Sequence, residues 1–122
     1  MTALLTAKDR HMTPPTRFAS SLVLPLLFAA PALAQQASVR LTIKDHRFIP
    51  SAPHAPANQP LTLIVKNLDS TAAEFESKTL RVEKVVAPGN EVTTQIRPLN
   101  PGRYHFFDDF HRDVAEGDLI VE

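Results

Sequence analysis

The sequence predicts an all-β fold, an antiparallel β-sandwich, and three observations support that prediction. Short segments in which apolar and polar residues alternate recur along residues 38–122. Turn signals rich in Pro and Gly separate these segments, and no stretch shows the helical period. We therefore expect one small domain with a single core, because residues 35–122 are too few for two.

Six strands follow from the alternation, taken in chain order. In the first, Val39, Leu41 and Ile43 alternate with polar residues, which is typical of a strand with one buried face. The six predicted strands are residues 39–44, 61–65, 85–86, 92–96, 102–108 and 119–121. Residues 71–84 lack the alternation, so we expect one helical turn or a long irregular loop there, of the kind that often carries function.

The start of the chain is predicted to be a secretory signal peptide, residues 1–34, followed by the domain at residues 35–122. Basic residues precede an apolar stretch at 18–28, and Ala32-Leu33-Ala34 resembles a cleavage site. The stretch is shorter than a bilayer requires, and Pro25 interrupts it, so a permanent membrane helix is the less favoured interpretation. Translation from Met12 in place of Met1 fits the pattern equally well.

Composition excludes several functions. The chain has 13 Lys and Arg against 13 Asp and Glu, so no field of one sign favours nucleic acid or an anionic membrane. It has no Cys, which excludes disulfides, thiolate metal sites and cysteine nucleophiles. Both methionines lie in the predicted signal peptide. Any metal bound by the domain would therefore have nitrogen and oxygen ligands.

One carboxylate is predicted to point into the core. In the strand at 102–108, Tyr104, Phe106 and Asp108 share a face, and the two aromatic residues make it the core face. A buried carboxylate is costly unless a cation, a metal or hydrogen-bond donors meet it. His111 follows three residues later, close enough to converge with Asp108 on one point.

The segment from Pro101 to Val121 resembles the C-terminal copper loop of cupredoxins, and the resemblance extends over residues 38–122. It implies a Greek-key β-sandwich. The family pattern has a Cys where Asp108 stands, a His at His111 and a Met where Ala115 stands, and the resemblance implies that Glu74 takes the place of the first copper-binding His. Because a blue copper site needs the thiolate, these replacements exclude a blue copper electron carrier.

Two further motifs are similar to the cupredoxin-like domains of EfeO-type periplasmic iron-uptake systems. They are E-F-E-S at 74–77 and F-H-x-x-x-A-x-G at 110–117. The resemblance implies an exported, periplasmic accessory domain that binds a divalent transition metal, iron or non-blue copper. Its expected partners are a membrane iron permease or other periplasmic iron-uptake proteins.

The predicted metal ligands form an oxygen-rich set with one imidazole. They are Glu74, Asp108 and His111, supported by Glu76, with Glu83 and Asp109 as further candidates. The ordinary alternative is a solvated acidic loop, with Glu83 paired to Arg81 or Lys84. His46, His54 and His105 are expected to be surface histidines.

Three functions remain open on this basis. The first is a metal-binding accessory of ferrous-iron or copper uptake. The second is a ferroxidase in which copper or iron oxidises Fe(II). The third is a metal-free sandwich that only contacts other proteins, with its carboxylates balanced by basic residues. Hydrolases are not favoured, because no nucleophile motif occurs.

Overall fold

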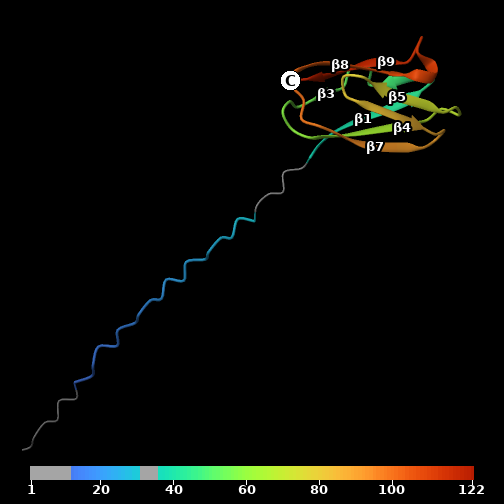
Figure 1. The fold of residues 1–122 in the computed structure, drawn as a ribbon. Coiled ribbons are helices and arrows are strands. Elements are labelled where there is room, and N and C mark those ends of the chain that lie inside the picture. Colours follow the sequence, from blue (N-terminus) through green and yellow to red (C-terminus); the bar gives the residue numbers. More distant parts are fainter. Residues whose placement is uncertain (1–11, 31–35) are drawn as a thin grey trace, which may run out of the picture. The chain divides into compact units, whose positions relative to one another are not determined.

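The computed structural model describes residues 12–30 and 36–122. Within 36–122 the chain forms two packed sheets, which confirms the predicted all-β sandwich (Figure 1). The first sheet has the order β2-β1-β4-β7 and the second the order β3-β9-β8-β5-β6. The strands are β1 (Ala37–Lys44), β2 (Arg47–Ile49), β3 (His54–Ala55), β4 (Leu61–Asn67), β5 (Ala73–Ser77), β6 (Val82–Val86), β7 (Glu91–Ile96), β8 (Gly102–Asp108) and β9 (Glu116–Val121), with a 3-10 turn, η1 (Asp109–His111), between the last two.

The sheets are mixed, whereas the sequence pattern led us to expect antiparallel pairing throughout. β1 pairs with β4 in parallel and β3 pairs with β9 in parallel, and the other pairs are antiparallel. The chain leaves the first sheet after β2, adds β3 to the second sheet and returns as β4 beside β1. Alternation reports which face of a strand is buried, and it carries no information on strand direction.

The prediction of a loop or helical turn at 71–84 is wrong. These residues form β5 and the start of β6, joined in an antiparallel hairpin. Ala73, Phe75 and Ser77 are buried, and Glu74 and Glu76 alternate with them on the outer face. The period of two was present, but two of the three buried positions carry a small or polar residue that does not read as core. β2 and β3 were not predicted either, because each is only two or three residues long.

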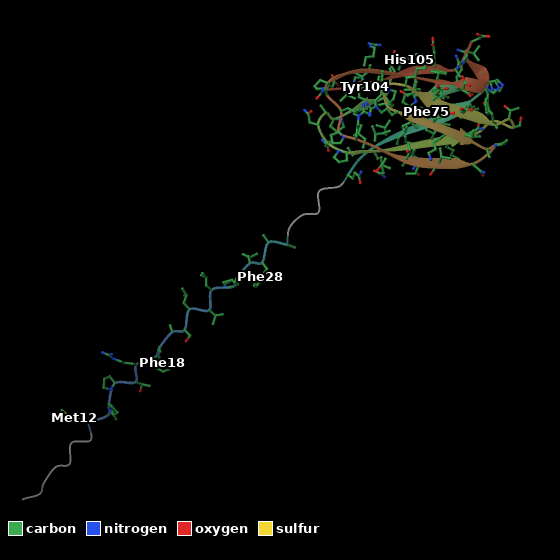
Figure 2. All side chains as sticks on the ribbon, in the orientation of Figure 1. Met12, Phe18, Phe28, Phe75, Tyr104 and His105 are labelled. Atoms are coloured by element: carbon green, nitrogen blue, oxygen red, sulfur yellow. The ribbon has the colours of Figure 1, made fainter. Side chains whose placement is uncertain are left out.

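The core lies between the inner faces of the two sheets. Its centre is a group of three phenyl rings, Phe48 from β2, Phe75 from β5 and Phe106 from β8, with centroids 4.9–5.9 Å apart. Figure 2 shows Phe75 within the sandwich and His105 on the outer side of β8. Phe75 and Phe106 are each 1% exposed, so each contributes about 2 kcal/mol or more through its buried apolar area.

A buried amide ties the two sheets together at one end. Asn67, at the end of β4, is fully buried, and its side chain donates hydrogen bonds to the carbonyls of Thr71 (2.8 Å) and Val86 (3.0 Å). Its side-chain oxygen accepts the N–H of Asp69 at 2.9 Å. Because Val86 belongs to β6, Asn67 joins the first sheet to the second and fixes the loop that carries Asp69.

Residues 12–30 form an extended, exposed segment. Met12, Phe18 and Phe28 are 87–93% exposed and lie along it (Figure 2). Among the described residues, no helix has the length and apolar character to cross a membrane. The rest of the predicted signal peptide, including the cleavage motif from Ala32, lies outside the described residues. The signal peptide and its boundary stay predictions.

We expect Gly117→Ala to destabilise the protein. A Cβ at Gly117 would lie 2.4 Å from the Ser51 carbonyl oxygen and 2.6 Å from the Phe106 ring, so backbone or core must shift. Overpacking of this kind costs about 1–3 kcal/mol in the free energy of unfolding, measured by chemical denaturation.

Gly102→Ala is the matched control. A Cβ there would lie 3.7 Å from the Tyr104 side chain, an ordinary contact, so we expect a change within about 0.5 kcal/mol. Equal destabilisation by the two substitutions would contradict the close-packing argument.

Candidate metal centre

Asp108 ends β8 with its side chain inside the sandwich, as the strand pattern predicted, and it is 0% exposed. Its Oδ1 accepts the backbone N–H groups of Glu74 (2.8 Å) and Phe110 (3.0 Å). Its Oδ2 lies 2.7 Å from Nδ1 of His111. The desolvation of this carboxylate is thus offset by three N–H donors of the protein itself.

His111 converges with Asp108, as the sequence predicted. It ends the 3-10 turn η1, for which Asp108 is the N-cap, and its side chain is 24% exposed. The position that the family pattern gives to an axial ligand is Ala115, which is fully buried and has no donor atom. Asp108, whose oxygens already accept hydrogen bonds, stands in place of the thiolate, and the methyl group of Ala115 stands in place of the axial ligand. These residues therefore do not fit a blue copper ion.

The predicted glutamates lie on the other side of the sheet. Glu74 and Glu76 project from the outer face of β5, and Asp109 follows β8 at the start of η1. One carboxylate oxygen from each of these three residues lies within 4.8 Å of the others. We call Glu74, Glu76 and Asp109 the acidic group.

Burial and the crowding of like charges disfavour the ionised form of Glu74. Partial burial raises its pKa. A hydrogen bond from its protonated carboxyl to Glu83 raises it further, as do the charges of Glu83, Asp109 and Glu76. Glu83, on the neighbouring strand β6, therefore belongs to the surroundings of the acidic group. Four carboxylates at one place on the surface repel one another and favour any cation that can lie among them.

The structure thus divides the predicted ligands into a pair and a group of three. Asp108 and His111 meet inside the end of the sandwich, and Glu74, Glu76 and Asp109 meet on its outer face. Glu74 touches Asp108 only through its backbone N–H, because the two side chains point to opposite faces. Among the described residues, the acidic group is the one cluster in which three or more His, Asp or Glu side chains bring their ligand atoms together. Metal ligation by any of them stays a prediction.

Arg112 contacts one member of the acidic group. Its guanidinium forms an ion pair and a hydrogen bond with the Asp109 carboxylate, and it lies 4.9 Å from the centre of the Phe107 ring. For Asp109, this contact agrees with the alternative in which basic residues balance the carboxylates. The other two members have no such partner among the ion pairs of the described residues.

Two of the remaining histidines are surface residues, as expected. His54 pairs with Glu122 at 2.7 Å, and His105 pairs with Asp118 at 3.0 Å, each ring being more than half exposed. Hydrogen bonds from His105 and Arg103 lower the pKa of Asp118 despite the opposing effect of its partial burial.

His46 is the residue that sequence reasoning missed. Its ring stacks on that of His111, with centroids 3.9 Å apart and an angle of 22° between the planes. Asp69 accepts the backbone N–H groups of Asp45 (2.7 Å) and His46 (2.9 Å), which holds the turn in place. Asp45-His46 looked like an ordinary exposed turn, and nothing in the local pattern relates it to a residue 65 positions away.

Comparison with known proteins gives one family. The sequence model of the cupredoxin-like domain matches residues 17–121. The uncharacterized protein RP394 of Rickettsia prowazekii is 45% identical over 83 residues, which are 68% of this chain and 66% of that protein. The chain therefore spans just under two thirds of that relative's length.

Several solved structures share the fold at low identity. The metal-binding domain of the Cu(I)-exporting ATPase CopA of Streptococcus pneumoniae superposes with a TM-score of 0.62 at 13% identity, over 70% of this chain and 84% of that one. Auracyanin A, a blue copper protein of Chloroflexus aurantiacus, gives 0.61 at 10% identity, over 72% and 100%. A copper-binding protein in its apo form gives 0.58 at 17%, over 70% and 86%.

We expect Asp108→Ala to destabilise the protein strongly. It would leave three N–H donors unpaired at a buried position, which costs about 3 kcal/mol or more in the free energy of unfolding. Asp109→Ala, next to it but on the outer face, should change that free energy by less than about 1 kcal/mol. Denaturant titration of the two variants measures both, and similar losses would contradict the assigned roles.

The ion pairs of Asp118 predict an acid-dependent loss of stability. Its pKa in the folded protein lies below the unfolded value of 3.8, so its contribution is present above about pH 4 and is lost as the pH falls through the folded pKa. Asp118→Asn should remove roughly 1 kcal/mol at neutral pH. The difference between the two proteins should shrink on acidification, and a difference that stays constant between pH 6 and pH 2 would contradict this role.

Proposed function

The chain belongs to the cupredoxin-like domain family, and we propose that it is a metal-binding module whose acidic group binds a hard divalent cation such as Fe(II). The observation that carries the proposal is the convergence of oxygen atoms from Glu74, Glu76 and Asp109 within 4.8 Å of one another. Carboxylate oxygens suit hard ions, and the domain offers no sulfur ligand.

The electrostatics of the acidic group support the same ion class. The pKa of Glu74 is raised because burial and the neighbouring carboxylates disfavour its ionised form. A dication placed among these oxygens would reverse that effect, since an opposite charge at close range favours ionisation. Binding should therefore release protons and weaken as the pH falls, because metal and proton compete for the same oxygens.

The scaffold supports a preformed site. Glu74 and Glu76 lie two apart on β5, a strand held by β6 on one side and β8 on the other. The Asp108 carboxylate binds the Glu74 backbone directly, and the following residue is Asp109. Ligands on hydrogen-bonded strands keep their separation, which lowers the ordering cost when an ion binds.

We further infer that the ion is cargo and that the module serves ferrous-iron uptake in the periplasm. The predicted signal peptide supports export, and the E-F-E-S and F-H-x-x-x-A-x-G motifs resemble those of the iron-uptake group. The expected partner is a membrane permease that receives the ion. A metal-free interaction domain is the second candidate, favoured by the ion pair between Arg112 and Asp109.

Removal of two members of the acidic group should abolish metal binding. We expect the chelator-treated full chain to bind one equivalent of Fe(II) or Mn(II) in an anaerobic calorimetric titration. Glu74→Gln combined with Glu76→Gln should weaken binding at least about tenfold, equivalent to roughly 1.4 kcal/mol, because two charged ligands become neutral. Glu91→Gln, on the other sheet beside Arg40, is the matched control and should leave affinity unchanged.

Absence of saturable binding would overturn the proposal, and catalytic consumption of Fe(II) and O₂ would assign the ferroxidase function instead.

Arg112→Gln separates the two candidate functions. Because the guanidinium competes for Asp109, its removal should strengthen binding of Mn(II) by about two- to fivefold, corresponding to an ion pair of roughly 0.5–1 kcal/mol. The metal-free alternative requires no gain in binding. A titration of this variant beside the unmodified protein distinguishes them.

A further inference from the structure

We propose that His46 and His111 form a second metal site, separate from the acidic group and selective for an imidazole-binding ion such as Cu(II). The two rings come from distant parts of the chain and lie in contact, with centroids 3.9 Å apart. Imidazole nitrogen suits copper, which also binds nitrogen and oxygen sites more tightly than the other divalent first-row metals. The site differs from the acidic group in its residues and in its preferred ion.

The hydrogen bond of His111 leaves one of its ring nitrogens free to bind a metal. Asp108 carries acceptor oxygens, so Nδ1 of His111, 2.7 Å from Oδ2, holds the ring proton in that contact. In the neutral ring Nε2 then has the lone pair. A carboxylate behind Nδ1 is the usual outer-shell partner of a metal-bound histidine, because it fixes the tautomer and orients the ring.

His46 is held beside it in a conformation that costs energy. Its φ is +56° and that of Asp45 is +52°, both in the left-handed region that favours glycine. Such a residue persists where its surroundings impose the conformation, and here both oxygens of Asp69 bind the two N–H groups of the turn. The strained turn thus places the imidazole of His46 against the ring of His111.

A ring nitrogen of His46 has no hydrogen-bond partner within the described part of the chain. Nδ1 is buried, and its contact with Oδ2 of Asp69, at 3.5 Å, does not meet hydrogen-bond geometry. A buried polar atom without a partner costs about 1–3 kcal/mol, and a rotation of the side chain toward an ion would remove that cost. Stacking keeps the in-plane lone pairs of the two rings parallel, so the nitrogens meet at one ion once the His46 ring turns out of the stack.

The charge around the two rings also favours a cation. Asp108 stands behind His111 and Asp69 behind His46, so two carboxylates face the site from the protein side. A dication bound to two neutral imidazoles would keep this local charge balanced.

Cu(II) titration of the full chain, with electron paramagnetic resonance of the one-equivalent complex, tests the proposal. We expect one tight equivalent whose spectrum shows hyperfine coupling to two imidazole nitrogens and no blue copper signature. His46→Asn should weaken Cu(II) binding at least about tenfold, since Asn tolerates the left-handed turn but supplies no imidazole. His111→Ala should have a similar effect. His105→Ala and His54→Ala are matched controls, because each removes an exposed histidine elsewhere, and they should bind as the unmodified protein does.

Asp108→Asn tests the positioning of His111 without removing a ligand. Its side-chain oxygen can still accept the two backbone N–H groups, but the amide would donate to Nδ1 and move the ring proton to Nε2. We expect the variant to fold, with its unfolding midpoint measured beside each titration, and to lose the second nitrogen coupling.

The result of the Cu(II) titration does not depend on the acidic group. The variant with both Glu74→Gln and Glu76→Gln should keep its Cu(II) equivalent, so failure of the Fe(II) or Mn(II) titration would not affect this result. Unchanged Cu(II) affinity in His46→Asn, equal loss in His105→Ala, or coupling to a single nitrogen would overturn the two-imidazole site.

Discussion

The buried carboxylate of Asp108 is the contact on which this end of the sandwich depends. It binds a backbone N–H of β5, a backbone N–H of η1 and the ring of His111, so one side chain joins three elements. Charged hydrogen bonds at a fully buried position are each worth more than neutral surface ones, and losing their acceptor leaves every donor unpaired. In cupredoxins this position holds a metal-binding thiolate. Here the protein's own donors occupy the carboxylate.

Both candidate metal sites take their geometry from that contact. By binding the Glu74 backbone, Asp108 sets the register of β5 against η1 and so brings Glu74 and Glu76 to Asp109. By binding Nδ1 of His111, it also fixes the ring on which His46 stacks. The residues of the E-F-E-S motif therefore have two kinds of role. Phe75 fills the core and the Ser77 hydroxyl donates to the His105 carbonyl at 2.6 Å, while the two glutamates remain outside.

Much of the fold could be predicted from local pattern, and the failures have physical causes. Strands with bulky alternating residues, such as β1 and β4, were predicted, as were the inward direction of Asp108 and its convergence with His111. β5 was missed because small and polar side chains occupy part of its buried face. Strand direction was missed because alternation does not encode it. His46 was missed because the stacking of two rings 65 residues apart depends on the Asn67–Asp69 loop and a left-handed turn, neither of which has a period.

The two sites differ in the feature that decides which ion a protein selects. The acidic group has three carboxylates on an exposed face with one guanidinium against them, so it offers charge and hard oxygen. The imidazole pair has two nitrogens with carboxylates behind them, so it offers softer ligands in a partly buried setting. The turn η1 carries Asp109 into the first and His111 into the second. One three-residue turn thus supplies a carboxylate to the hard ligand set and an imidazole to the borderline set, because its first and last side chains point to different places.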